Sequence, residues 1–114
     1  MTPNMLKSLM KPAAYPVTTS TVELVQTHVS WIFLTDTHAF KLKKPVNFGF
    51  LDFSTVDRRR FYCNEELRLN RRLCPDIYEA VVELRESPAG IAFLGGGPII
   101  DYAVTMKRLP ADHM

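Results

Sequence analysis

The chain has 114 residues, of which 46% are hydrophobic and 23% are charged, and its formal net charge at pH 7 is only +2. This length allows one compact domain with a single modest core, and the composition excludes a disordered or low-complexity chain. No apolar stretch approaches the ~18 residues of a membrane span, and residues 1–10 lack the basic start and continuous apolar block of a signal peptide. We therefore expect a cytoplasmic protein without a membrane partner.

Residues 1–21 are predicted to form an N-terminal extension, with a short amphipathic helix at 4–10 that is closed off by prolines. From residue 22 onward the chain becomes rich in β-branched and aromatic residues, which are typical of strands. Three consecutive antiparallel strands are predicted at 22–25, 29–34 and 39–43. In the third strand side chains alternate, so that Ala39, Lys41 and Lys43 share one face of the sheet.

One long helix is predicted at 55–73, because Ser54 or Thr55 can cap its start and Pro75 ends it. Further strands are predicted at 78–84, 91–94 and 99–106. The last of these is apolar almost throughout and is therefore expected in the centre of the sheet. The predicted fold class is α+β: an antiparallel sheet of five to six strands with one main helix packed on it. Cys63 and Cys74 would then lie too far apart on the helix for a disulfide, as free thiols.

Glu66 is the most informative residue of the predicted helix. At ~100° per residue it falls near the middle of the apolar face, which comprises Tyr62, Cys63, Leu67, Leu69, Leu73 and Cys74. A carboxylate in that position needs a cationic partner, and Lys41 of the third strand is the candidate. Lys43 and Lys44 are expected at the surface. Lys43 shares the sheet face of Lys41 and is the alternative to it in the ion pair. Glu65 is the alternative to Glu66.

An alanine followed two residues later by a lysine suits a flat base and its phosphates, and a helix glutamate that orients this lysine is a feature of kinases. The chain resembles the N-terminal lobe of the protein-kinase-like superfamily, and more closely its aminoglycoside phosphotransferase-like branch. It is similar to a bacterial family of uncharacterised aminoglycoside-phosphotransferase-like proteins, some of which carry a further P-loop ATPase domain. The stretches that carry this resemblance are 27–31, 41–54, 65–73 and 106–110.

The resemblance implies that the cofactor is ATP and that Lys41, oriented by Glu66, contacts its α- and β-phosphates. The glycine-rich loop of kinases is missing, and Gln26 to Ser30 occupies that turn. There the backbone amides, with the side chains of His28 and Ser30, are expected to touch phosphate. The magnesium ligands and the general base would belong to a C-terminal lobe beyond residue 114, so this lobe would carry no catalytic residue and would be inactive alone.

The resemblance also assigns the adenine end of the site. Ala39 would cover the base, and Met106 would occupy the gatekeeper position at the end of the last strand. The Lys107 C=O and the Leu109 N–H would bond the adenine edge. The phosphate acceptor is an alcohol that this segment does not identify. We expect the isolated lobe to self-associate through the apolar strip near Met106 and Leu109.

Two alternatives stand beside the phosphotransferase hypothesis. The first is a pseudokinase-like scaffold, which would keep this lobe without turnover. The second is a basic module that binds nucleic acid or another polyanion through a cluster of arginines: Arg58, Arg59, Arg60, Arg68, Arg71 and Arg72. No aromatic residues alternate with these arginines to stack on bases, so we expect no nucleic-acid partner. Gly95 to Gly97 lack a following Lys-Ser/Thr and are predicted to be a turn, and the three histidines lack the spacing of a zinc site.

Overall fold

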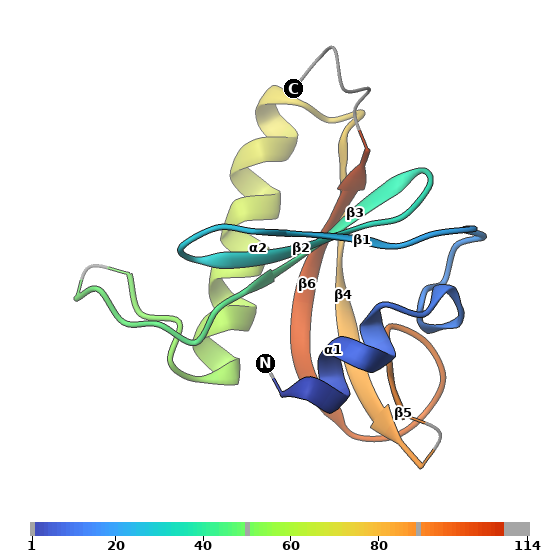
Figure 1. Ribbon diagram of the computed structural model, residues 1–114. Helices are drawn as coiled ribbons and strands as arrows, with labels where there is room; N and C mark the ends of the chain where they lie inside the picture. The colour runs from blue at the N-terminus through green and yellow to red at the C-terminus, as the bar shows by residue number, and fades with distance from the viewer. Residues whose placement is uncertain (1, 50, 89, 109–114) are drawn as a thin grey trace.

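The computed structural model describes residues 2–49, 51–88 and 90–108, which form an α+β fold as predicted (Figure 1). Its helices are α1 (Pro3–Leu9) and α2 (Val56–Leu73), with a short 3-10 helix η1 (Pro12–Ala14) after α1. The strands are β1 (Glu23–Gln26), β2 (Ser30–Leu34), β3 (His38–Lys43), β4 (Tyr78–Ser87), β5 (Gly90–Ala92) and β6 (Ile99–Lys107). Every predicted element is present, and β4 runs three residues further than predicted.

The strands form one antiparallel sheet in the order β1-β2-β3-β6-β4-β5. β6 lies between β3 and β4, which confirms the central position that its apolar sequence predicts. β1 and β2 run across the direction of β4 and β6, so the sheet is strongly curled (Figure 1). Register shifts in β4 opposite β6 accompany this curvature, as β-bulges commonly do.

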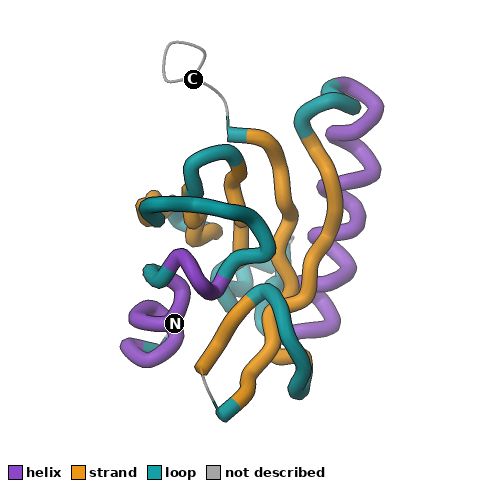
Figure 2. The backbone as a smooth tube through the Cα atoms, turned by 90° about the vertical axis from the view of Figure 1, so that its right-hand side faces the viewer, coloured by secondary structure: helices purple, strands orange, loops and turns teal. Residues whose placement is uncertain are grey.

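The main core lies on the face of the sheet that α1 covers, whereas α2 lies on the other face (Figure 2). The fully buried side chains of this core include Leu9, Phe33, Phe40, Leu42 and Leu84. Tyr15 packs edge-on against Phe40, with 4.9 Å between the ring centroids, and donates its hydroxyl to the Leu9 carbonyl at 2.6 Å. The segment predicted as an N-terminal extension therefore contributes buried side chains to the same core.

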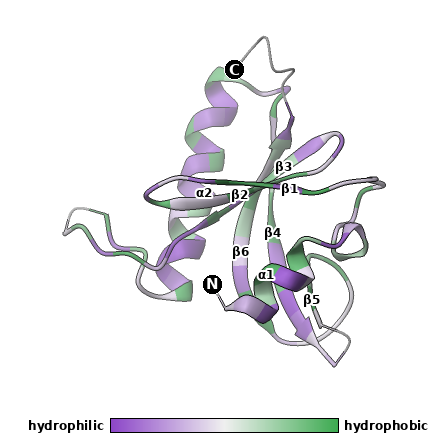
Figure 3. Cartoon of the chain, in the orientation of Figure 1, coloured by the Kyte–Doolittle hydropathy of each residue, from purple (hydrophilic) through white to green (hydrophobic). Residues whose placement is uncertain are grey.

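Helix α2 begins where the sequence predicts. The Thr55 hydroxyl accepts a hydrogen bond from the Arg58 N–H at 3.2 Å, which satisfies one of the free amides of the first turn. Hydrophilic and hydrophobic residues are interspersed along the helix (Figure 3), and its fully packed positions are Arg59 and Cys63. The prediction that Leu69 and Leu73 belong to the buried face is wrong, since they are 50% and 83% exposed.

The connection from β5 to β6 contains Gly95 to Gly97 and is a turn, as predicted. Gly97 has φ +106°, and a Cβ atom there would collide with the Glu86 carbonyl oxygen. We expect Gly97→Ala to lower the free energy of unfolding by about 1–3 kcal/mol, because the backbone would have to move. Gly96→Ala is the matched control, since no atom lies within 4 Å of the position that its methyl group would take. Urea unfolding measures the stability of both variants. Equal unfolding midpoints for Gly97→Ala and Gly96→Ala would contradict the expected strain at Gly97.

Cys63 is buried and Cys74 is exposed, and both are free thiols, as predicted. Neither α1, α2 nor any other helix within the described ranges has the length and apolar character needed to cross a membrane.

Candidate functional site

The sheet face opposite the main core carries the predicted site residues in neighbouring rows. Side chains that lie directly opposite one another in paired strands point to the same face. Ala39 is paired with Leu34 and Met106, Lys41 with Ile32 and Val104, and Lys43 with Ser30. We call this surface the lysine face. It extends for about 13 Å along β3 from Ala39 to Lys43.

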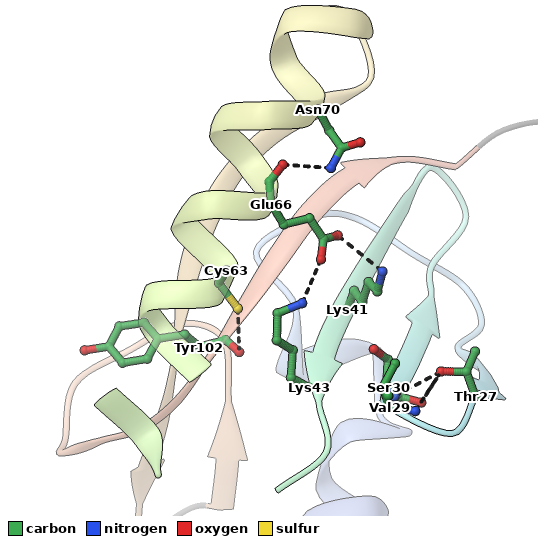
Figure 4. Close-up of polar contacts among 9 residues, drawn as sticks. All are labelled: Thr27, Val29, Ser30, Lys41, Lys43, Cys63, Glu66, Asn70 and Tyr102. Atoms are coloured by element: carbon green, nitrogen blue, oxygen red, sulfur yellow. Dashed lines mark hydrogen bonds and ion pairs between the residues drawn. The ribbon is translucent and has the colours of Figure 1, made fainter. Parts of the chain in front are cut away.

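Lys41 and Lys43 both point from β3 to the carboxylate of Glu66 on α2 (Figure 4). The Lys41 Nζ lies 3.3 Å from the Glu66 Oε2, so the predicted ion pair is present. The Lys43 Nζ lies 2.7 Å from the Oε1 of the same carboxylate. One carboxylate therefore holds two ammonium groups, one on each oxygen.

The prediction that Lys43 lies at the surface is wrong. Its side chain is 8% exposed, against 28% for Lys41, and its ammonium lies 5.1 Å from the centre of the Phe53 ring. Alternation along β3 places Lys43 on the same face as Lys41, but its burial depends on Phe53, which comes from the loop before α2. Glu65 is not the alternative to Glu66, because it is half-exposed and bonds Arg68 at 2.7 Å.

The charge state of the Glu66 carboxyl results from two opposing effects. Burial alone would raise its pKa, but the hydrogen bond and charge of Lys43, followed by the charge of Lys41, outweigh burial and lower the pKa. Glu66 is therefore ionised at neutral pH. The neighbouring Cys63 thiol has its pKa raised to about 11, mainly by burial, and so remains protonated at neutral pH.

At the other end of the lysine face lies an apolar pocket of about 340 Å³. Its lining includes three of the residues predicted for the adenine end, Ala39, Met106 and Lys107, together with the exposed Cys74 at the end of α2. The Lys107 N–H donates to the Ile77 carbonyl at 2.9 Å, which leaves the prediction for the Lys107 C=O untouched. Leu109, the remaining predicted adenine contact, lies outside the described residues.

Ser30 lies beside Lys43 on the lysine face and is fully buried. Its hydroxyl is the one buried side-chain polar atom without a hydrogen-bond partner among the described residues. The backbone amides of Val29 and Ser30 already donate to the Thr27 hydroxyl, at 3.3 and 3.0 Å (Figure 4). The prediction that backbone amides of this turn contact a ligand is therefore not supported for these two, and the Ser30 hydroxyl is unpaired but buried.

Three of the six arginines in the cluster on α2 pair with a carboxylate. Arg59 is buried and bonds Asp101 at 3.1 Å, Arg58 pairs with Asp52 and Arg68 with Glu65. Because Arg59 is buried, it cannot belong to the polyanion-binding surface that the alternative hypothesis assigns to the six arginines. Arg60, Arg71 and Arg72 are exposed and have no carboxylate partner among the described residues, so three positive charges of the cluster remain free on α2. In the described part of the chain, no group of His, Cys, Asp and Glu side chains has the arrangement of a metal site.

No protein-family model matches this chain, and no solved structure matches it. Among curated proteins, the chain is similar to uncharacterized proteins of Mycobacterium tuberculosis (strain H37Rv) and Mycobacterium bovis. It is 36% identical to each over 80 residues, which is 69% of this chain and 16% of the relative. The chain therefore spans a small part of the length of these relatives, whose names state no activity.

Proposed function

We propose that this chain is the nucleotide-covering lobe of a protein-kinase-like phosphotransferase, which moves a phosphoryl group from ATP to an alcohol group of a small molecule. The observation that carries the proposal is the Lys41–Glu66 ion pair on the same sheet face as the apolar pocket at Ala39 and Met106. ATP needs both features, an apolar slot for the base and an oriented cation for the phosphates.

The residues of the lysine face fit the two ends of this ligand. The small, buried side chain of Ala39 leaves room above the sheet for a planar base beside Met106. Lys41 is the more exposed of the two lysines and can reach a phosphate. The Ser30 hydroxyl has no partner among the described residues but is fully buried, so it would have to be uncovered before it could contact a phosphate.

When bound, ATP supplies the phosphoryl group, and a second lobe would supply the magnesium ligands, the general base and the acceptor site. The greater length of the mycobacterial relatives is compatible with a second lobe.

The proposal is tested by titrating the 114-residue chain with ATP in a calorimeter. We expect Lys41→Met to weaken ATP binding by about tenfold or more, because one charge-assisted hydrogen bond to a phosphate is lost. Lys44→Met is the matched control. Lys44 follows β3, and its ammonium lies over the Trp31 ring, 5.6 Å from the ring centre. The affinity of the Lys44→Met variant for ATP should therefore differ from that of the unmodified chain by less than about twofold. A chain that does not bind ATP, or a Lys41→Met variant with unchanged affinity, would contradict the proposal.

A further inference from the structure

The Glu66 carboxylate is shared by two lysines that differ in distance, exposure and ring contacts. Lys43 is nearer, at 2.7 Å against 3.3 Å for Lys41, and its side chain is 8% exposed against 28%. Phe53 lies against the Lys43 ammonium, so that lysine has a second fixed contact. Lys41 has no ring contact of this kind with any of the described residues.

We infer that Lys43 is the fixed anchor of Glu66, and that Lys41 is the exchangeable lysine, which can leave the carboxylate for a phosphate while Glu66 stays paired. The first half of this inference concerns the unliganded chain alone. The second half rests on the proposed function, because it names what Lys41 would exchange for. Lys43 is thus a positioning residue that acts on the ligand through Glu66.

The physical reason is the cost of an unpaired buried charge. Glu66 is 15% exposed, and a buried carboxylate that loses its sole cation is strongly destabilised. If Lys41 were the sole partner of Glu66, a phosphate that bound Lys41 would leave the buried carboxylate unpaired, and this cost would weaken phosphate binding. Since Lys43 remains on the Oε1 of Glu66, Lys41 can move from the Oε2 to a phosphate while the carboxylate keeps its stronger partner. The second lysine therefore makes the exchange inexpensive.

A titration without nucleotide tests the anchor. The ionisable groups around Glu66 are Lys41 and Lys43 of β3, Cys63 of α2 and Tyr78 of β4. Carboxyl ¹³C NMR can follow the protonation of Glu66 in the chain and in its variants. We expect Lys43→Met to raise the Glu66 pKa more than Lys41→Met does, and Lys44→Met to leave it unchanged. An equal or larger rise in Lys41→Met would overturn the assignment of Lys43 as anchor.

If the Lys43→Met variant does not fold, the Lys41→Met variant tests whether Lys43 is the anchor of Glu66. A Glu66 pKa that stays low without Lys41 supports Lys43 as the anchor, and a return to the ordinary glutamate value overturns it. Circular dichroism of each variant separates a loss of fold from a change in ionisation.

ATP affinity tests the exchange. In Lys43→Met the carboxylate should retain Lys41, so affinity for ATP should fall by about tenfold, and Lys43→Arg should restore it to within about threefold. Adding Glu66→Gln to Lys43→Met should recover part of the affinity, because the neutral amide releases Lys41. No recovery in that double variant would overturn the exchange and indicate that Lys43 binds phosphate itself. If the unmodified chain fails to bind ATP, the proposed function fails, while the titration of Glu66 still decides the anchor.

Discussion

The Glu66→Ala variant should unfold with a free energy about 3–5 kcal/mol below that of the unmodified chain, because it removes the carboxylate from a buried ion pair. Most of this destabilisation comes from Lys43, because its side chain is 8% exposed and its ammonium would be left buried without a counter-charge. Lys41, at 28% exposure, can turn toward water. Chemical denaturation monitored by the fluorescence of Trp31 measures the difference.

Glu65→Ala is the matched control for Glu66→Ala. The two glutamates are adjacent on α2, and each is paired with a cation at 2.7 Å. Glu65 and its partner Arg68 are solvated, however, and exposed pairs of this kind contribute little to stability. Similar losses in the two variants would contradict the view that burial, and not the mere presence of an ion pair, makes Glu66 important.

The effect of Glu66 should depend on pH in one direction. The folded chain has a lowered Glu66 pKa, so folding stabilises the ionised carboxylate. This contribution is fully present above the pKa of the unfolded side chain, about 4.3, and it disappears as the pH falls through the lower pKa of the folded state. The stability difference between the unmodified chain and Glu66→Ala should therefore shrink in acid. A difference that grows below about pH 4 would contradict this ion pair.

Local patterns in the sequence predict most of the fold, because the chain has clear periodicity. Alternation along residues 39–43 assigns Lys41 to the sheet face away from Phe40, and helical spacing directs Glu66 toward the same face. The two residues come from elements that are adjacent in the structure, so the ion pair follows from two local patterns and one assumption about packing. Their agreement explains why the pair could be predicted.

The features that sequence analysis missed depend on contacts between distant segments. Arg59 belongs to a run of three arginines that looks solvated, yet it is buried and pairs with Asp101, which lies 42 residues later. The burial of Lys43 requires Phe53 from the loop before α2. Leu69 and Leu73 fit the apolar pattern of the helix but are 50% and 83% exposed. No periodicity within one element carries this information.

Arg59→Ala should likewise lower the free energy of unfolding by about 3–5 kcal/mol at neutral pH, because it leaves the Asp101 carboxylate buried without its cation. Arg59 also donates to the Phe53 carbonyl at 2.8 Å, so the substitution loosens the loop that packs on Lys43. Arg58→Ala is the matched control: this neighbouring arginine is 57% exposed, and its loss should have little effect.

The Arg59→Ala loss should also grow with pH, although the pKa of Asp101 shifts in the opposite direction to that of Glu66. Burial raises the pKa of the Asp101 carboxyl, while the Tyr102 N–H and the charge of Arg59 oppose this rise. Removing Arg59 should raise that pKa further, so the folded variant holds its proton more tightly than the unfolded chain does. The penalty is then small below the unfolded pKa of about 3.9 and increases as the pH rises through the folded pKa. Denaturant midpoints of the unmodified chain and of Arg59→Ala at about pH 4 and pH 7 test this expectation. A loss of stability that is larger at the lower pH would show that Asp101 does not depend on Arg59 for its charge. The burial of Arg59 would then need another explanation.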